Sequence, residues 1–150
     1  MATRIKARTG RLYETDFFLW TKEQAAALRA GRLDALERDN IAEEIESFGR
    51  KDRRELESRL TVLVMHLLRW RDQPDQRGGS WDSTIRTQRR EIQKLLHDSP
   101  SLRSAVAEAI EGSYDTARRN ASAEAGLALD ALPATCPFEL EQILADEWLP

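Results

Sequence analysis

Apolar residues recur at helical spacing along residues 40–70, the longest patterned stretch of the chain. At about 100° per residue they form one narrow stripe, which consists of Ile41, Ile45, Phe48, Leu56, Leu63 and Trp70. A stripe that keeps its register for about eight turns predicts one long helix, from near Asp34 to Trp70. Gly49 lies inside this helix, and the sequence leaves open whether the glycine bends or breaks it.

A shorter helix is predicted before this stretch and a loop after it. The first helix begins at Asp16 or Thr21, both common capping residues, and ends at Gly31. Its apolar members are Phe17, Phe18, Trp20, Ala25 and Leu28. The loop covers residues 71–80 and contains Pro74 and two adjacent glycines.

Three further helical segments follow the loop. Amphipathic patterns predict helices over residues 80–97 and 99–125, and a short last helix over 138–145 that is capped by Thr135 or Cys136. No alternating pattern is long enough for a strand. We therefore predict an all-α fold, an antiparallel bundle of four main helices plus a short C-terminal helix.

Length and charge narrow the class of protein. The 150 residues suit one domain, which we place at residues 12–150, preceded by a disordered basic arm over residues 1–11. The arm holds four of the 23 basic residues, so 19 remain against 26 acidic ones and the body has a net charge of −7. Such a balance argues against binding to nucleic acid, which rests on a positive field.

The chain shows no sign of a membrane span or of a disulfide framework. Its longest apolar run, residues 60–68, is far shorter than the roughly 20 residues that a spanning helix needs. Cys136 is the single cysteine, which fits a reducing compartment. We therefore expect a cytoplasmic protein with no membrane partner.

Three polar residues, Asp52, Arg59 and His66, lie seven residues apart inside the apolar stripe. We expect them to be buried, and therefore to be paired as part of the scaffold or to form a catalytic site. The scaffold interpretation is the commoner one for a histidine on an apolar face. As an alternative, Arg59 and His66 have the spacing R-x6-H, which resembles the R-x4-6-H motif of the HEPN superfamily of all-α ribonucleases. In those enzymes the pair acts as general acid or base and as phosphate stabiliser without a metal.

A metal site is a second alternative. Glu44, Glu55 and His66 are its candidate ligands, because both glutamates border the apolar stripe. Di-metal helical bundles need Glu-x-x-His on two helices, whereas Leu63 and Lys94 occupy the positions three before the two histidines. We therefore predict no cofactor.

Supporting residues are expected on the helix over residues 80–97. Gln88 and Arg89 border its apolar side, where they can reach a polar group of the long helix, and Trp81 lies near its start as a core anchor or an interface residue. Glu44, which lies on the long helix at the edge of the apolar stripe, is a further supporting residue. Whether Cys136 caps a helix, packs in the core or reacts is left open.

Several ordered motifs resemble the bacterial domain of unknown function family 29. They are YETDFFLW, IAEEIESFGRKDRRELESRLTVLVMHLLRW, SWDSTIRTQRREI, SPSLR, LPATCPFELEQIL and a terminal Trp-Leu-Pro, and the resemblance covers roughly residues 12–150. The positions that resemble the family pattern are Asp16, Trp20, Glu43, Glu44, Ile45, Gly49, His66, Trp70, Trp81, Ile85, Gln88, Arg89, Pro133, Cys136, Pro137 and Trp148. The resemblance implies a compact, all-helical, cytoplasmic bacterial protein, and it implies no activity.

Our first functional hypothesis is a non-enzymatic helical interaction module. Its partner is an unknown protein or a second copy of the chain in a homodimer. The second hypothesis is a metal-independent ribonuclease of the toxin type that uses Arg59 and His66. The third is a metal-dependent hydrolase.

Overall fold

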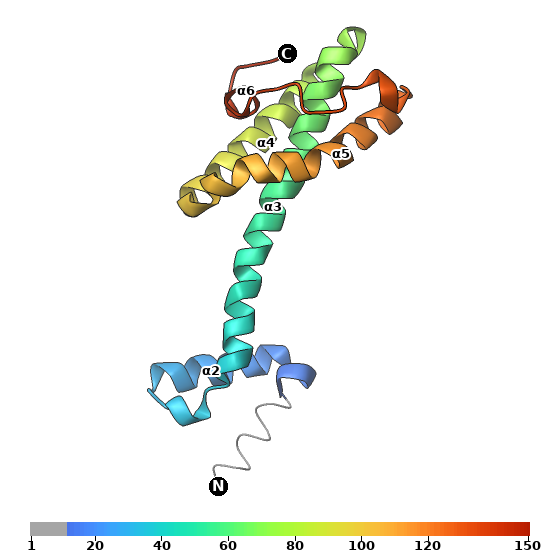
Figure 1. Cartoon of the computed structure of the whole chain (residues 1–150). Helices are drawn as coiled ribbons and strands as arrows, with labels where there is room; N and C mark the ends of the chain where they lie inside the picture. The colour runs from blue at the N-terminus through green and yellow to red at the C-terminus, as the bar shows by residue number, and fades with distance from the viewer. Residues whose placement is uncertain (1–11) are drawn as a thin grey trace. The chain divides into compact units, whose positions relative to one another are not determined.

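The computed structural model describes residues 12–150, and these residues contain helices but no strand (Figure 1). The predicted all-α class is confirmed. The arm predicted over residues 1–11 lies outside the described residues. No helix of the described part of the chain is long and apolar enough to cross a membrane.

The chain divides into two compact units, one ending at Arg50 and the other beginning at Lys51. The first unit holds residues 12–15, which are helical, then α2 (Phe17–Arg29), the 3-10 helix η1 (Leu33–Ala35) and the beginning of α3 (Arg38–Asp72). The second unit holds the rest of α3, then η2 (Pro74–Gln76), α4 (Gly79–Asp98), η3 (Pro100–Ala105), α5 (Val106–Ala125), η4 (Leu129–Ala131) and α6 (Leu140–Leu144). The single domain over residues 12–150 stays a prediction.

Local sequence explains where α2 begins and ends. Asp16 is its N-cap, because a carboxylate oxygen of Asp16 accepts a hydrogen bond from the backbone N–H of Leu19 at 3.0 Å. Thr21, the other predicted start, lies inside the helix and donates its hydroxyl to the carbonyl of Phe18. Gly31 follows with a φ of 68°, a conformation that a side chain disfavours, so the chain turns there.

The long helix α3 is continuous through Gly49. It begins four residues later than predicted, because residues 33–35 form the separate turn η1. Its apolar stripe does not remain buried along its whole length. Leu56 and Leu63 are fully buried, whereas Ile45 and Phe48 are 66% and 70% exposed. The expectation that the entire stripe faces a core is wrong for residues 41–50, since the first unit is too small to cover them.

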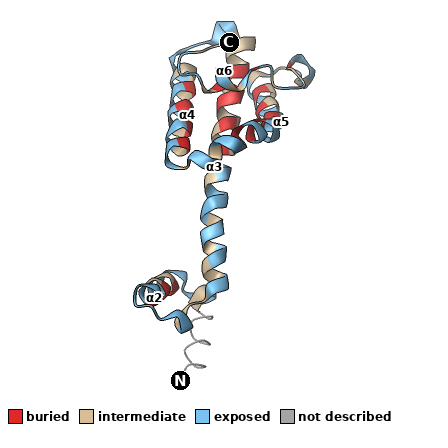
Figure 2. Ribbon diagram, turned by 60° about the vertical axis from the view of Figure 1, so that its left-hand side comes forward, coloured by how far each residue is buried: buried red, intermediate tan, exposed pale blue. Residues whose placement is uncertain are grey.

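The hydrophobic core lies in the second unit, where α4 and α5 lie beside the C-terminal half of α3 (Figure 2). Its fully buried side chains include Leu56, Leu60, Leu63, Leu67, Leu68, Ile85, Ile92, Ala117 and Ile143. These positions repeat every three or four residues on each helix, as the amphipathic patterns require. Leu56 and Leu63, two members of the predicted stripe, lie in this core.

The C-terminal segment after α5 is tied to that core by polar side chains. Gly126 ends α5 with a φ of 65°, and Arg118 then donates to the carbonyls of Leu129 and Leu132 at 2.9 and 3.0 Å. Tyr114 donates its hydroxyl to the carbonyl of Pro133 at 2.7 Å. Most of these contacts end on backbone carbonyls, which any sequence provides.

Two predicted boundaries near the C-terminus are wrong. The short helix α6 begins at Leu140, and its cap is Glu139, not Thr135 or Cys136. Glu139 and Gln142 form a reciprocal capping box, which satisfies backbone N–H groups at the helix start. The α-helix predicted from Ser99 opens instead as η3, before α5 begins at Val106.

Candidate interaction surface

Large apolar side chains are exposed on the first unit. They are between 39% and 70% exposed, and we call this set the N-terminal apolar surface: Phe17, Phe18, Leu19, Leu28, Leu33, Ile45 and Phe48. By contrast, only Trp20 and Ala27 are buried apolar residues among residues 12–50. Large exposed apolar residues concentrated in one part of a protein mark an interaction site more often than residues scattered singly.

The helix α2 contributes Phe17, Phe18, Leu19 and Leu28. At 100° per residue, the run from Phe17 to Trp20 turns about 300° around the helix axis, so one neighbouring helix cannot cover all four side chains. Trp20 takes the buried position, where its indole Nε1 donates to Glu37 at 2.9 Å. This uninterrupted run is the sequence signal of an exposed apolar face, because no amphipathic helix encloses four consecutive apolar residues.

The contacts that fix α2 against the start of α3 are polar and aromatic. Gln24 is buried and accepts a hydrogen bond from the backbone N–H of Glu37 at 2.9 Å. The Tyr13 hydroxyl donates to Glu44 at 2.6 Å, and its ring lies edge-on to Trp20 at 4.8 Å between centroids. The hydrogen bond to Glu44, together with desolvation, raises the pKa of Tyr13. These bonds position the exposed residues without burying them.

The beginning of α3 presents an uncharged stripe. Ile41, Ile45 and Phe48 lie within about 60° of one another around the helix axis. Arg50 lies on the opposite side, where it pairs with Glu43 at 2.6 Å and with Glu46 at 3.7 Å. The ion pairs of Arg50 therefore lie away from the stripe, whereas Glu44 borders the stripe and Asp52 follows it one turn after Phe48.

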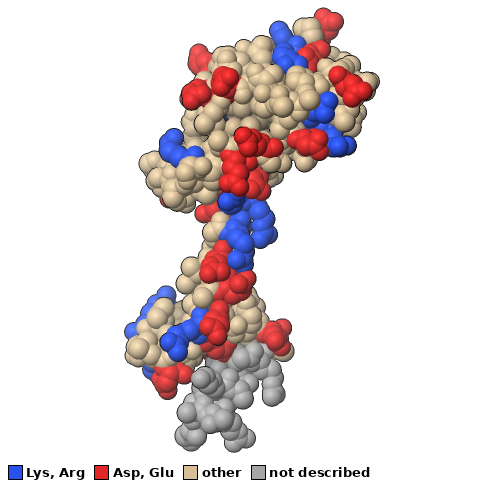
Figure 3. Space-filling model, in the orientation of Figure 1, with Lys and Arg blue, Asp and Glu red and all other residues tan. Residues whose placement is uncertain are grey.

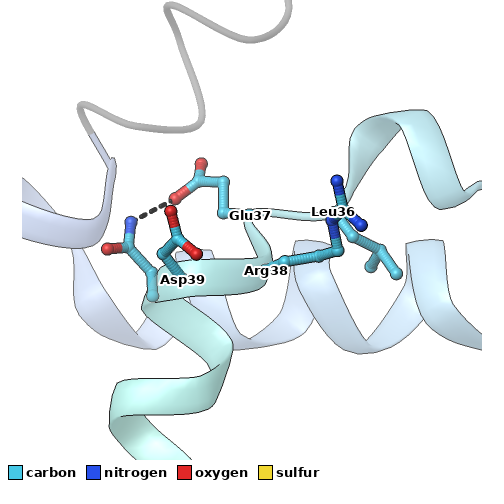
Figure 4. Close-up of a pocket in the computed structure, with 5 residues that line it drawn as sticks. Leu36, Glu37, Arg38 and Asp39 are labelled. Atoms are coloured by element: carbon cyan, nitrogen blue, oxygen red, sulfur yellow. Dashed lines mark hydrogen bonds between the residues drawn. The ribbon is translucent and has the colours of Figure 1, made fainter.

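A pocket of about 330 Å³ lies at the junction before α3 and is lined by residues 36–40 (Figure 4). Asn40 donates to one carboxylate oxygen of Glu37 at 2.7 Å, the same oxygen that accepts from Trp20. The other oxygen of Glu37 is buried and has no hydrogen-bond partner within the described part of the chain. The lining is that of a connecting turn, with no set of groups that converges on a ligand.

Arg59 and His66, the predicted catalytic pair, lie in the second unit and are each engaged by their own surroundings. Arg59 donates to Glu55 at 2.8 and 3.0 Å and to Gln88 at 3.4 Å, and Glu91 lies 3.9 Å away. Its charge is therefore neutralised, which leaves little attraction for a phosphate.

His66 is half-buried, not fully buried as expected. Its Nδ1 lies 2.9 Å from the carbonyl oxygen of Val62, one turn earlier in the same helix. Asp52 is half-buried as well. Seven residues separate Arg59 from His66, about 10.5 Å along the helix axis, so the structure does not bring the two side chains into contact.

The predicted metal ligands do not converge either. No group of three or more His, Cys, Asp or Glu side chains that could hold an ion occurs within residues 12–150. Glu44 is bonded to Tyr13 in the first unit, and Glu55 is bonded to Arg59 in the second. Glu55 and His66 are eleven residues apart on α3, about 16 Å along its axis.

The supporting residues have structural partners. Gln88 contacts Arg59 as predicted, since its amide oxygen accepts the bond from that guanidinium. Trp81 lies under Arg69, whose guanidinium carbon is 4.3 Å from the indole centroid and which also pairs with Glu124. The Cys136 thiol donates to the carbonyl of Phe138 at 3.7 Å, and burial raises its pKa, so it remains a protonated packing residue.

Arg89 is 1% exposed and binds three backbone carbonyls at the end of α6. It donates to Ile143 at 2.9 Å and to Gln142 and Asp146 at 3.2 Å each. Burial lowers the pKa of this guanidinium, and the nearby charges of Asp146 and Asp82 oppose that effect. Arg89 therefore binds the backbone carbonyls at the C-terminal end of α6. The sequence had suggested a different partner, a polar group of α3.

The fold and this surface define a class: an all-helical protein whose exposed large apolar side chains, among the described residues, lie on one unit. The chain belongs to the family described as Domain of unknown function DUF29, whose pattern it matches over residues 12–149. No curated protein and no solved structure matches the chain. The resemblance to this family that the sequence motifs indicate is confirmed. The family has no assigned function.

Proposed function

We propose that this protein is a bacterial, cytoplasmic, non-enzymatic interaction module that binds a protein partner through the N-terminal apolar surface. One observation carries the proposal: every large apolar side chain found exposed within the described residues lies between Phe17 and Phe48. The second unit, by contrast, encloses its large apolar side chains in a core.

The exposed side chains would be costly to leave in water. Burying a Phe, Leu or Ile side chain contributes about 1.5–3 kcal/mol, so a partner that covers even three of them gains a substantial part of a binding free energy. Three of its seven members are phenylalanines, and aromatic residues are enriched at the centres of protein interfaces.

The charge pattern favours a protein over nucleic acid or a lipid surface. Residues 1–50 contain nine acidic and nine basic side chains, so this part of the chain has no net positive charge that would attract phosphate groups. On the face seen in Figure 3, Lys and Arg side chains gather in one group midway along α3 and elsewhere lie among acidic side chains. The single cysteine supports a reducing compartment such as the cytoplasm.

Site-specific photo-crosslinking in living bacteria tests this function. A photoreactive phenylalanine analogue replaces Phe18 or Phe48, and the same analogue at Ser58, an exposed position of α3 outside the surface, is the control. We expect covalent protein adducts from positions 18 and 48 but not from 58. The absence of adducts at both phenylalanine positions, or equal adducts at Ser58, would contradict the proposal.

A further inference from the structure

We propose that the middle of α3 is a hinge. Its backbone hydrogen bonds open transiently around Ser47, Phe48 and Gly49, while the helix before and after this segment stays folded. The segment lies directly before the boundary between the two compact units, which falls between Arg50 and Lys51 inside the helix. The inference goes beyond the proposed function and does not depend on it.

Burial is distributed unequally along α3. No residue from Arg38 to Glu55 is buried, whereas seven residues between Leu56 and Leu68 are. Figure 2 accordingly draws the middle of the helix in pale blue and tan. Most helical stability in proteins comes from the packing of an apolar face, and a stretch without such packing is marginal in water. The middle of α3 therefore depends on its own hydrogen bonds and side chains.

Contacts with other elements hold α3 on both sides of this segment. On one side, Glu44 accepts a hydrogen bond from the Tyr13 hydroxyl at 2.6 Å. On the other side, Arg53 pairs with Glu108 of α5 at 3.1 Å. Within the described part of the chain, the side-chain hydrogen bonds and ion pairs of residues 45–52 are made inside α3. The segment thus lies between two anchored stretches of the same helix.

Arg50 makes the ion pairs that cross the segment. It pairs with Glu43 at 2.6 Å and with Glu46 at 3.7 Å, and all three side chains are about half exposed or more. Exposed pairs of this kind contribute little to helix stability, and salt screens them. They align the segment without preventing it from opening.

The amino-acid composition makes the helix weakest at the same place. Ser47 and Phe48 have only moderate helix propensity, and Gly49 has the lowest of any residue except proline. Neither packing nor backbone geometry requires a glycine there, because a Cβ added at Gly49 would meet no atom within 4 Å and its φ is not positive. Three such residues in succession ease opening where no contact with another element opposes it.

Hydrogen exchange of the full-length chain, read by mass spectrometry of short peptides, tests the hinge. The amides of residues 46–52 should be protected at least about a hundredfold less than those of residues 60–68, and less than those of residues 20–27 in α2. Gly49→Ala should raise the protection of residues 46–52 about four- to fivefold, because alanine favours the helix over glycine by about that factor.

Gly112→Ala is the matched control. Gly112 is likewise an exposed glycine inside a helix, and a Cβ added there meets no atom within 4 Å. Because Gly112 lies on α5, this change should leave the protection of residues 46–52 unaltered. Circular dichroism should show the helical content of the wild type in both variants.

Three outcomes would overturn the inference. The first is equal protection of residues 46–52 and residues 60–68. The second is an effect of Gly49→Ala on residues 46–52 that is no larger than that of Gly112→Ala. The third is equal protection of residues 20–27 and residues 46–52, because the whole first unit would then open at once and not the middle of α3 alone.

Discussion

Arg89 allows the sharpest test of how this fold is held together. Its guanidinium donates three hydrogen bonds, at 2.9, 3.2 and 3.2 Å, to carbonyls near the end of α6. Arg89→Met keeps the apolar stem and removes all three donors. The remaining carbonyls lose their partners in a buried place, where each unsatisfied group is costly.

The magnitude follows from these contacts. A hydrogen bond from a charged donor contributes about 1.5–3 kcal/mol, but the three bonds share one cation and two of the carbonyls are only part-buried. We therefore expect Arg89→Met to lower the free energy of unfolding of the second unit by about 3–4 kcal/mol. Arg89→Lys should recover only part of this loss, because one ammonium cannot reproduce the fork of a guanidinium.

Urea unfolding followed by circular dichroism measures the loss, and hydrogen exchange locates it. The amides of residues 140–146 should lose protection first, since they lie in the segment that Arg89 binds. Arg90→Met is the matched control, because Arg90 is the next residue, is exposed and pairs only loosely with Glu91 at 3.6 Å. A cost below about 1 kcal/mol for Arg89→Met, or one equal to that of Arg90→Met, would refute the reasoning.

Three further predictions concern other parts of the chain. Tyr13 and Tyr114 both have folded-state pKa values raised above 10.0, Tyr13 first by its hydrogen bond to Glu44 and Tyr114 first by burial. Their contribution to stability is therefore full below pH 10 and is lost as the pH rises through the folded-state values. Ultraviolet titration should show the raised pKa values, and alkaline unfolding should show the loss of stability. Tyr114→Phe should reduce the pH dependence of stability. Tyrosines that ionise at the ordinary pKa in the folded protein would contradict the prediction. Gly112→Ala should stabilise the protein by about 0.5–1 kcal/mol, because Gly112 lies inside α5 and the added Cβ meets no atom within 4 Å. Gly126→Ala should destabilise the protein by about 1 kcal/mol, because a φ of 65° disfavours a side chain. Thermal unfolding of both variants measures these changes in stability. A change of the same sign in both variants would contradict the prediction. Finally, purified wild type and His66→Ala should leave labelled RNA equally intact, because Arg59 is neutralised by its neighbours; cleavage by the wild type alone would revive the ribonuclease hypothesis.

Much of the second unit was predictable because local pattern and tertiary contacts agree there. Leu56, Leu60 and Leu63 recur at helical spacing and are fully buried. The start of α4 follows from its N-cap Gly78, and the end of α5 from Gly126. The least predictable part was the C-terminal segment, whose shape depends on Arg89, Arg118 and Tyr114. Their acceptors are backbone carbonyls distant in sequence, and every residue type has such a carbonyl, so the sequence does not indicate which one is bound.

By itself, the sequence determined the helical class and the family, whereas the continuity of α3 through Gly49 came from the structure. These depend on periodicity and ordered motifs, which are properties of neighbouring residues. Only the tertiary structure decided which part of the apolar stripe is buried against other helices. Leu63 and Phe48 occupy the same face of one helix, yet Leu63 is enclosed by α4 and α5 whereas Phe48 is 70% exposed. Burial depends on what other segments bring to a face, and the pattern of one helix cannot report that.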